Sequence, residues 1–133
     1  GYIGEVKKEL EHLAEQAFEC GEPNIPEDLS QAVKIAADYA ARHYREAVGL
    51  GDAAEAAGVN STYLSYLFSQ EMGIGFANYL LNLRMEHAKK LLRETNLKMW
   101  QVAEESGFND YHYFSKVFKK AEGMSPAQYR KHS

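Results

Sequence analysis

Apolar residues recur at every third or fourth position along most of the chain, and this periodicity predicts helices. One helix is expected over residues 5–19, and a second is expected from Asp28, a suitable N-cap with Gln31 three residues later. The stretch "GEPNIPED" between them carries two prolines and no periodicity, so it is predicted to be a linker. No segment shows a convincing strand pattern, and the sequence therefore predicts an all-α fold. The apolar positions of the second helix are Leu29, Val33, Ala36, Ala37, Ala40 and Tyr44.

The second half of the chain contains one pattern twice. Residues 52–58, "DAAEAAG", align with residues 101–107, "QVAEESG", at an offset of 49 positions. Residues 63–68, "YLSYLF", align with residues 113–118, "YFSKVF", at an offset of 50, so one residue is inserted before the later helix. Two copies are too few for a solenoid, which needs about three. Two related modules are expected instead.

Each copy has the sequence features of a helix-turn-helix. A short helix is followed by Gly58 or Gly107, which suits the left-handed backbone that ends a helix. Asn60 or Asn109 follows and can cap the next helix. We therefore predict helix-turn-helix motifs at about 51–73 and 99–123. The side chains expected to face the core from the two second helices are Leu64, Leu67, Phe68, Phe114, Val117 and Phe118, and Tyr63, Tyr113 and Trp100 are expected to pack as well.

The opposite faces of the two second helices carry residue types that can reach base edges and phosphates. The candidate DNA-contacting residues are Ser61, Thr62, Ser65 and Tyr66 in the first copy and Asp110, His112, Ser115, Lys116, Lys119 and Lys120 in the second. A polar, solvated surface explains the first set equally well. The lysines favour DNA contact for the second set, because phosphate contacts supply most sequence-independent affinity.

Residues 75–95, between the two copies, are predicted to form one continuous helix. Its apolar side chains are expected on one face: Phe76, Leu80, Leu83, Ala88, Leu91 and Leu92. About twenty residues at 1.5 Å each span roughly 30 Å, and successive major-groove faces of B-DNA lie about 34 Å apart. Such a helix could hold two DNA-reading helices one turn of DNA apart. Arg84 lies among apolar neighbours and is expected to have a structural role.

Charge is distributed unevenly along the chain. The 15 Lys and Arg residues against 19 Asp and Glu give a net charge of −4, which by itself disfavours nucleic-acid binding. However, residues 52–83 contain no Lys or Arg, whereas ten of these residues occur from Arg84 onward. The basic charge of the second half is therefore confined to the last fifty residues.

Several classes of function are disfavoured by the composition. Cys20 is the single cysteine, and no Cys and His residues have the spacing of a zinc site, so neither a metal nor another cofactor is expected. No paired acid and base, nucleophile arrangement or phosphate-binding glycine loop indicates an enzyme. No apolar run approaches the roughly 18 residues that span a bilayer. We therefore expect a soluble, cytoplasmic protein with no membrane partner.

The second copy and the residues after it resemble a known family. The string "VAEESGFNDYHYFSKVFKKAEGMSPAQYRK" and the connecting "RMEHAKKLL" are similar to the DNA-binding domain of the AraC/XylS family of bacterial transcription regulators. The resemblance covers approximately Leu29 to Lys131. It implies two helix-turn-helix motifs, a pair of homeodomain-like units joined by a long central helix, that read adjacent major-groove segments of a promoter. It places a DNA-binding domain at 28–133 and a separate helix and linker at 1–27.

The resemblance also implies partners. Double-stranded DNA is the expected ligand, and an upstream sensor or receiver domain is expected to be absent from this fragment. The acidic N-terminal residues look similar to the region that precedes this domain in response-regulator members. Family members commonly carry a basic residue where this chain has Tyr66, and a basic pair where it has Ser69 and Gln70. The alternative function is therefore a helical protein-interaction module that contacts RNA polymerase or a partner subunit and has weakened DNA binding in its first half.

Overall fold

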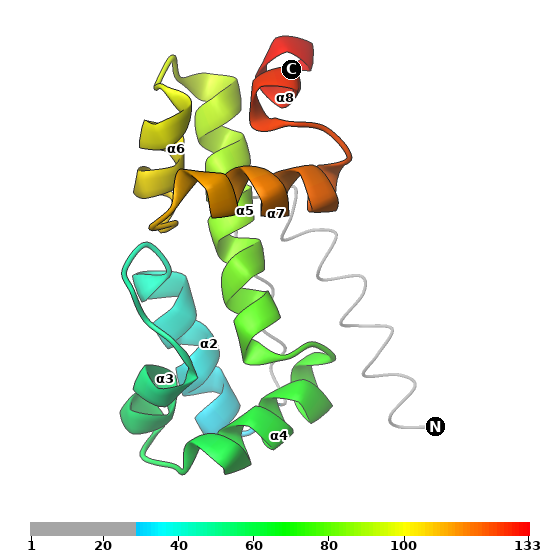
Figure 1. The fold of residues 1–133 in the computed structure, drawn as a ribbon. Coiled ribbons are helices and arrows are strands. Elements are labelled where there is room, and N and C mark those ends of the chain that lie inside the picture. Colours follow the sequence, from blue (N-terminus) through cyan, green and yellow to red (C-terminus); the bar gives the residue numbers. More distant parts are fainter. Residues whose placement is uncertain (1–28) are drawn as a thin grey trace.

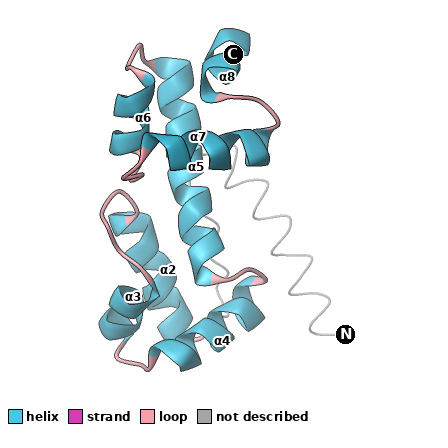
Figure 2. Cartoon of the chain, viewed as in Figure 1, coloured by secondary structure: helices cyan, strands magenta, loops and turns pink. Residues whose placement is uncertain are grey.

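Seven helices form the regular structure of residues 29–133, the part of the chain that the computed structural model describes (Figures 1 and 2). In chain order they are α2 (Gln31–His43), α3 (Leu50–Ala57), α4 (Ser61–Met72), α5 (Phe76–Glu94), α6 (Met99–Glu105), α7 (Tyr111–Glu122) and α8 (Pro126–His132). The predicted all-α fold is confirmed for these residues. The helix expected at 5–19 and the linker after it lie outside the described residues.

The helix predicted from Asp28 begins slightly later. Its N-cap is Ser30, and the first helical residue is Gln31, so the helix starts two residues later than expected. The backbone N–H and the hydroxyl of Ser30 both donate to the carboxylate of Glu71 in α4, at 2.6 and 2.5 Å. These bonds fix Ser30 against another element of the fold, and α2 starts immediately after it.

Two helix-turn-helix motifs are present, α3–α4 and α6–α7. Gly58 and Gly107 in their turns have left-handed backbone, with φ of +69° and +99°. The Asn60 side chain caps α4 by accepting the N–H groups of the second and third helical residues. The corresponding cap of α7 is Asp110, so the expected cap at Asn109 is wrong. Asp110 is the residue that aligns with Asn60 at the offset of 50, and the extra residue of the second copy is accommodated in the turn.

Two hydrophobic cores lie along α5. The first is formed by α2, α3, α4 and the start of α5, and the second by α6, α7, α8 and the end of α5. In Figure 1, α4 lies beside the start of α5, and α7 crosses α5 farther along. Each module therefore has its own core on its own half of one helix of 19 residues.

The expectation of a single apolar face on α5 is wrong. The first half buries Phe76, Tyr79 and Leu80, whereas the second half buries Met85, Ala88 and Leu92. At about 100° per residue, the second set is turned by roughly 150° about the helix axis relative to the first. The two modules consequently pack against different sides of α5, and Tyr79 and Met85 were missed because one stripe was assumed.

The last helix is tied to the end of α5. Ser125 caps α8 with its side chain and Pro126 occupies the first helical position, as their sequence indicates. The guanidinium of Arg130 donates to the carbonyls of Leu92 and Leu97, at 3.1 and 2.7 Å. These bonds satisfy carbonyls at and just beyond the C-terminal end of α5, which would otherwise lack intrahelical partners.

Candidate nucleic-acid interface

The second helix of each motif has one buried and one exposed face. Leu64 and Phe68 in α4, and Phe114 and Phe118 in α7, are completely buried. These pairs occupy aligned positions of the repeat, so the two helices face their cores in the same manner. The helix faces opposite them are exposed.

Most of the predicted contact residues lie on these exposed faces. The exposed ones are Thr62, Ser65, Tyr66, His112, Lys116, Lys119 and Lys120, whereas Ser61 and Ser115 are half-buried. Asp110 is also exposed, but its carboxylate accepts the backbone N–H of His112 at 2.9 Å and caps α7. The structure thus gathers four residues on α4 and five on α7, and it places Asp110 at the start of α7.

The α7 face carries free positive charge. Among residues 29–133, no ion pair engages Lys116, Lys119 or Lys120. Lys119 and Lys120 lie in the last turn of α7, where a cation is also favoured by the negative end of the helix dipole. These three ammonium groups therefore lie exposed on α7, without a carboxylate partner among the described residues.

Lys89 shows the contrasting case of a lysine whose charge is already used. Its Nζ lies 2.9 Å from Glu86 Oε1 and 3.0 Å from Glu122 Oε1, which links α5 to the last residue of α7. Burial lowers the pKa of Lys89, but the hydrogen bonds to the two carboxylates outweigh it and the pKa is raised. Lys89 is therefore a structural cation and is not counted in the interface.

The α4 face has no cation. Of its large apolar side chains, Tyr66 is the most exposed, at 65%. A tyrosine can make apolar contact with a thymine methyl group, but it cannot form the bidentate bond with guanine that arginine forms. The α4 face therefore suits base-edge and apolar contacts better than phosphate neutralisation.

Two tyrosines belong to the exposed surface and were wrongly expected to pack. Tyr63 and Tyr113 occupy aligned positions in α4 and α7, and each is 53% exposed. Each immediately precedes a fully buried residue and therefore lies at the edge of the exposed face. In both copies the tyrosine comes one residue before the first buried position of the helix. This shared position is the sequence feature that could have predicted their exposure.

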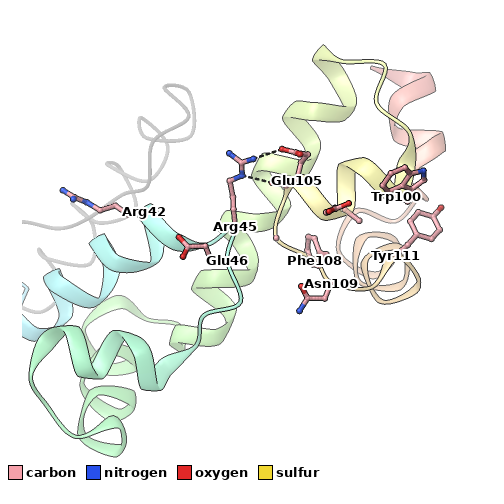
Figure 3. A pocket seen from close by; sticks show the side chains of 11 residues that line it. Arg42, Arg45, Glu46, Trp100, Glu105, Phe108, Asn109 and Tyr111 are labelled. Atoms are coloured by element: carbon pink, nitrogen blue, oxygen red, sulfur yellow. Dashed lines mark hydrogen bonds and ion pairs between the residues drawn. The ribbon is translucent and has the colours of Figure 1, made fainter.

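Trp100 was also wrongly expected to pack and is 54% exposed. It lies roughly 200° around α6 from Val102, which is buried, so it points away from the core. Trp100, Phe108 and Tyr111 line an open pocket between the modules together with Arg42 and Arg45 (Figure 3). None of the ten predicted contact residues lines this pocket.

Arg84 has the structural role that its apolar neighbours indicated. Its Nε and Nη2 donate to the carbonyls of Tyr44 and Glu46, at 2.7 and 3.0 Å. The described residues contain no group of three or more His, Cys, Asp or Glu side chains that could hold a metal ion. No helix between residues 29 and 133 combines the length and apolar character that crossing a membrane requires.

Comparison with known proteins gives consistent matches. A family model described as a helix-turn-helix domain matches residues 53–132. The chain is 39% identical over 120 residues to the uncharacterized HTH-type transcriptional regulator YisR of Bacillus subtilis, covering 90% of the chain and 40% of that protein. It is 30% identical over 122 residues to the arabinose operon regulatory protein of Escherichia coli, covering 91% of the chain and 42% of that protein. The chain thus spans about two fifths of the length of these curated relatives.

A solved structure matches over a larger share of its own length. The C-terminal domain of AraT, a response regulator from Geobacillus stearothermophilus, is 41% identical in sequence and superposes with a TM-score of 0.77. The match covers 80% of this chain and 88% of that domain. Both the sequence relatives and the solved structure therefore agree with the helix-turn-helix arrangement described above.

Proposed function

The chain belongs to the AraC-type helix-turn-helix family of transcription-regulator DNA-binding domains, and from this premise we propose that it reads two adjacent major-groove segments of a promoter. The observation that carries the proposal is the repeat of one exposed helix face. Helices α4 and α7 hold equivalent faces away from separate cores, on a helix whose 19 residues span roughly 28 Å. That length is close to one turn of B-DNA.

In this proposal the two modules have different tasks. Thr62, Ser65 and Tyr66 of α4 contact base edges at one end of the site, and Ser61 contacts the backbone at the start of that helix. Tyr63 lies beside them and extends the α4 contact surface.

The proposed contacts of α7 include charged ones. His112, Ser115 and Lys116 reach base edges, whereas Lys119 and Lys120 contact phosphates. Asp110, with one carboxylate oxygen bonded to the His112 N–H, can accept a further bond from a cytosine amino group. The α7 module therefore supplies most of the charge-dependent affinity. We assign the DNA-binding domain to residues 28–133 and treat residues 1–27 as a separate segment.

Selection of binding sites from random double-stranded DNA tests the proposal. We expect a selected site with two informative segments about 10 base pairs apart, centre to centre. Binding to it at physiological salt should be at least about 10³-fold tighter than binding to random DNA. Failure to enrich any sequence, with binding no tighter than to random DNA, would refute the proposal.

A second candidate function is supported by one observation. The exposed face of α4 presents Tyr63 and Tyr66 and no Lys or Arg, which is closer to a protein-contact surface than to a phosphate-contact surface. In this alternative α4 contacts RNA polymerase or a partner subunit, and α7 alone reads DNA. A selected site with a single informative segment, which α4 substitutions do not affect, would favour this alternative.

A further inference from the structure

The two modules meet at a polar junction beside α5. The loop Tyr44–Glu46, which follows α2, is contacted by three other parts of the fold. These are α5, through Arg84 and His87, the end of α6, through Glu105, and the turn before α7, at Gly107. None of the ten proposed DNA-contacting residues takes part in these contacts. The junction is thus separate from the proposed interface and connects the two parts that carry it.

Arg84 is the central side chain of the junction. It belongs to α5, and its two bonds go to main-chain carbonyls of the first module, those of Tyr44 and Glu46. Burial lowers the pKa of the Arg84 guanidinium, which nevertheless stays charged at neutral pH because a guanidinium titrates far above it. Hydrogen bonds from an ionised donor are stronger than neutral ones, so these bonds hold the loop firmly to α5.

Two further contacts fix the same loop. The Tyr44 hydroxyl lies 2.8 Å from His87 Nδ1 on α5. Arg45 Nε donates to the backbone carbonyl of Glu105 at 2.8 Å, and Arg45 Nη2 donates to the Glu105 carboxylate at 2.6 Å (Figure 3). Both side chains of this ion pair are about half exposed, so its charge contributes little to stability. Its bond to the carbonyl, however, links the first module directly to the C-terminal end of α6.

Gly107 brings the backbones of the two modules into contact. A Cβ at this position would lie 2.4 Å from the Tyr44 carbonyl oxygen and 3.0 Å from the Arg45 Cα, and both are main-chain atoms that a rotamer change cannot move. Gly58, at the aligned position of the first module, also has left-handed backbone, but nothing lies within 4 Å of its Cβ position. In both modules the turn needs glycine for its left-handed backbone. In the second module it also needs glycine because a side chain would collide with the backbone of Tyr44 and Arg45.

We infer that Gly107 and Arg84 are positioning residues that fix the orientation of α7 relative to α4 and thereby set the spacing between the two DNA segments that the chain binds together. Each module keeps its own core on its own half of α5, so the junction can be disrupted without removing either core. The consequence for DNA rests on the proposed function. The fixed orientation is a property of the free protein and is measurable without DNA.

The spacing consequence follows from effective concentration. When one module is bound, the second binds intramolecularly, and the gain in affinity is largest when the second module already points at its own segment. A rigid junction makes this gain depend sharply on the distance between the segments. A loosened junction makes the gain smaller at the best spacing and less sensitive to spacing.

The first test measures DNA affinity as a function of spacing. Kd is determined for the selected site and for the same site with one base pair inserted between its segments. The affinity of the parent should fall about tenfold or more on insertion, because the second DNA segment is moved away from the position that the second module faces. Gly107→Ala and Arg84→Met should reduce this ratio toward one while binding a single-segment site as the parent does. Gly58→Ala imposes left-handed strain without a clash and should keep the parental ratio.

The second test measures orientation in the free protein. Spin labels are attached through Gln70→Cys in α4 and Ala121→Cys in α7, both exposed positions, in a chain carrying Cys20→Ser. The parent should give one narrow distance distribution, and Gly107→Ala and Arg84→Met should broaden or shift it, whereas Gly58→Ala should not. Circular dichroism identifies which variants are folded, and Arg84→Met serves if Gly107→Ala does not fold.

The outcomes separate the two proposals. Parental distance distributions in the folded junction variants, or a parental spacing ratio in them, would overturn the inference. If the parent itself bound no two-segment site, the proposed function would fail, and the label distances would still decide whether the junction fixes the modules. Broadened distances together with a reduced spacing ratio support the inference.

Discussion

The α3–α4 module and the α6–α7 module are built from the same interior and present different exteriors. Their second helices each have 12 residues, begin at an Asn or Asp cap and end at a left-handed glycine, Gly73 or Gly123. The exposed face of α7 carries three lysines, whereas the matching face of α4 carries none. The buried and capping positions are alike in the two motifs, so the exposed positions can differ in residue type without changing the fold.

The largest expected effect comes from removing a matched core residue in each module. Phe68→Ala and Phe118→Ala each delete a completely buried ring at aligned positions, which should cost about 3–5 kcal/mol of unfolding free energy. Because the cores are separate, hydrogen exchange should accelerate mainly in α2–α4 for the first variant and mainly in α6–α8 for the second. Uniform acceleration over both modules in either variant would show that the domain unfolds as one unit.

The two modules also show what the sequence could predict. The repeat, its caps and its buried positions were predictable because each depends on neighbours within one turn of helix or one motif. Periodicity alone could not reveal that α5 serves two cores on different sides, because Met85 and Leu92 pack against residues that come later in the chain. Gly107 could be predicted as a turn glycine, but its approach to Tyr44 depends on two segments that are distant in sequence.

The placement of the candidate contact residues was predictable to a similar extent. The polar positions opposite the buried stripe were identified from spacing, and nine of the ten lie on α4 or α7. The exposure of Tyr63, Tyr113 and Trp100 was not predicted, because apolar residues at the edge of a helix face are buried only if another element covers them. Whether an element does so is a matter of tertiary packing.

Removing the lysines of α7 should weaken binding to all DNA sequences. Each phosphate contact contributes about 0.9 to the dependence of log K on log salt concentration, so Lys119→Ala with Lys120→Ala should reduce this slope by up to about 2. The control is Lys90→Ala with Lys98→Ala, which removes the same charge from exposed positions outside α4 and α7. Equal slopes for both double variants and the parent would assign the DNA surface elsewhere.

Adding lysines to α4 should make the modules more alike. Ser69→Lys with Gln70→Lys places two cations at the positions that align with Lys119 and Lys120, and both sites are exposed. If α4 lies against DNA, the salt slope should steepen by up to about 2. Asn78→Lys with Asn82→Lys adds the same charge to exposed positions of α5 and should have a smaller effect. An unchanged slope in the α4 variant would support the protein-contact alternative for that helix.

Tyr79 and Tyr129 occupy aligned positions of the repeat but differ in the hydrogen bonding of their hydroxyl groups. Among residues 29–133 the buried Tyr79 hydroxyl has no hydrogen-bond partner, and burial, with a smaller contribution from Asp38, raises its pKa to about 12. The Tyr129 hydroxyl instead accepts a bond from Arg93 at 2.9 Å. Tyr79→Phe should therefore leave the unfolding free energy unchanged or raise it, whereas Tyr129→Phe should lower it by about 1 kcal/mol. Urea unfolding measures both free energies. A larger loss of unfolding free energy for Tyr79→Phe than for Tyr129→Phe would contradict this prediction.

The smallest expected effect is a pH dependence at the junction. Burial lowers the pKa of His87 from its ordinary value of 6.5, and the charges of Arg45 and Lys90 lower it further, while Glu105 opposes them. The unfolded chain therefore binds a proton at His87 before the folded chain does as the pH falls. The unfolding free energy should accordingly decrease as the pH drops through 6.5 and level off below the folded pKa of His87.

His87→Gln isolates this contribution, because glutamine keeps a polar partner for the Tyr44 hydroxyl but does not titrate. The difference in unfolding free energy between parent and variant should be constant above neutral pH, where His87 is uncharged in both states. It should then shift in favour of the variant as the pH is lowered from 7 toward 5. In the parent alone, proton binding at residue 87 then stabilises the unfolded chain more than the folded one. Urea unfolding at several pH values gives this difference directly, since the two proteins differ only at position 87. A difference that stayed constant across that range would mean that His87 is as accessible to protons in the folded junction as in the unfolded chain.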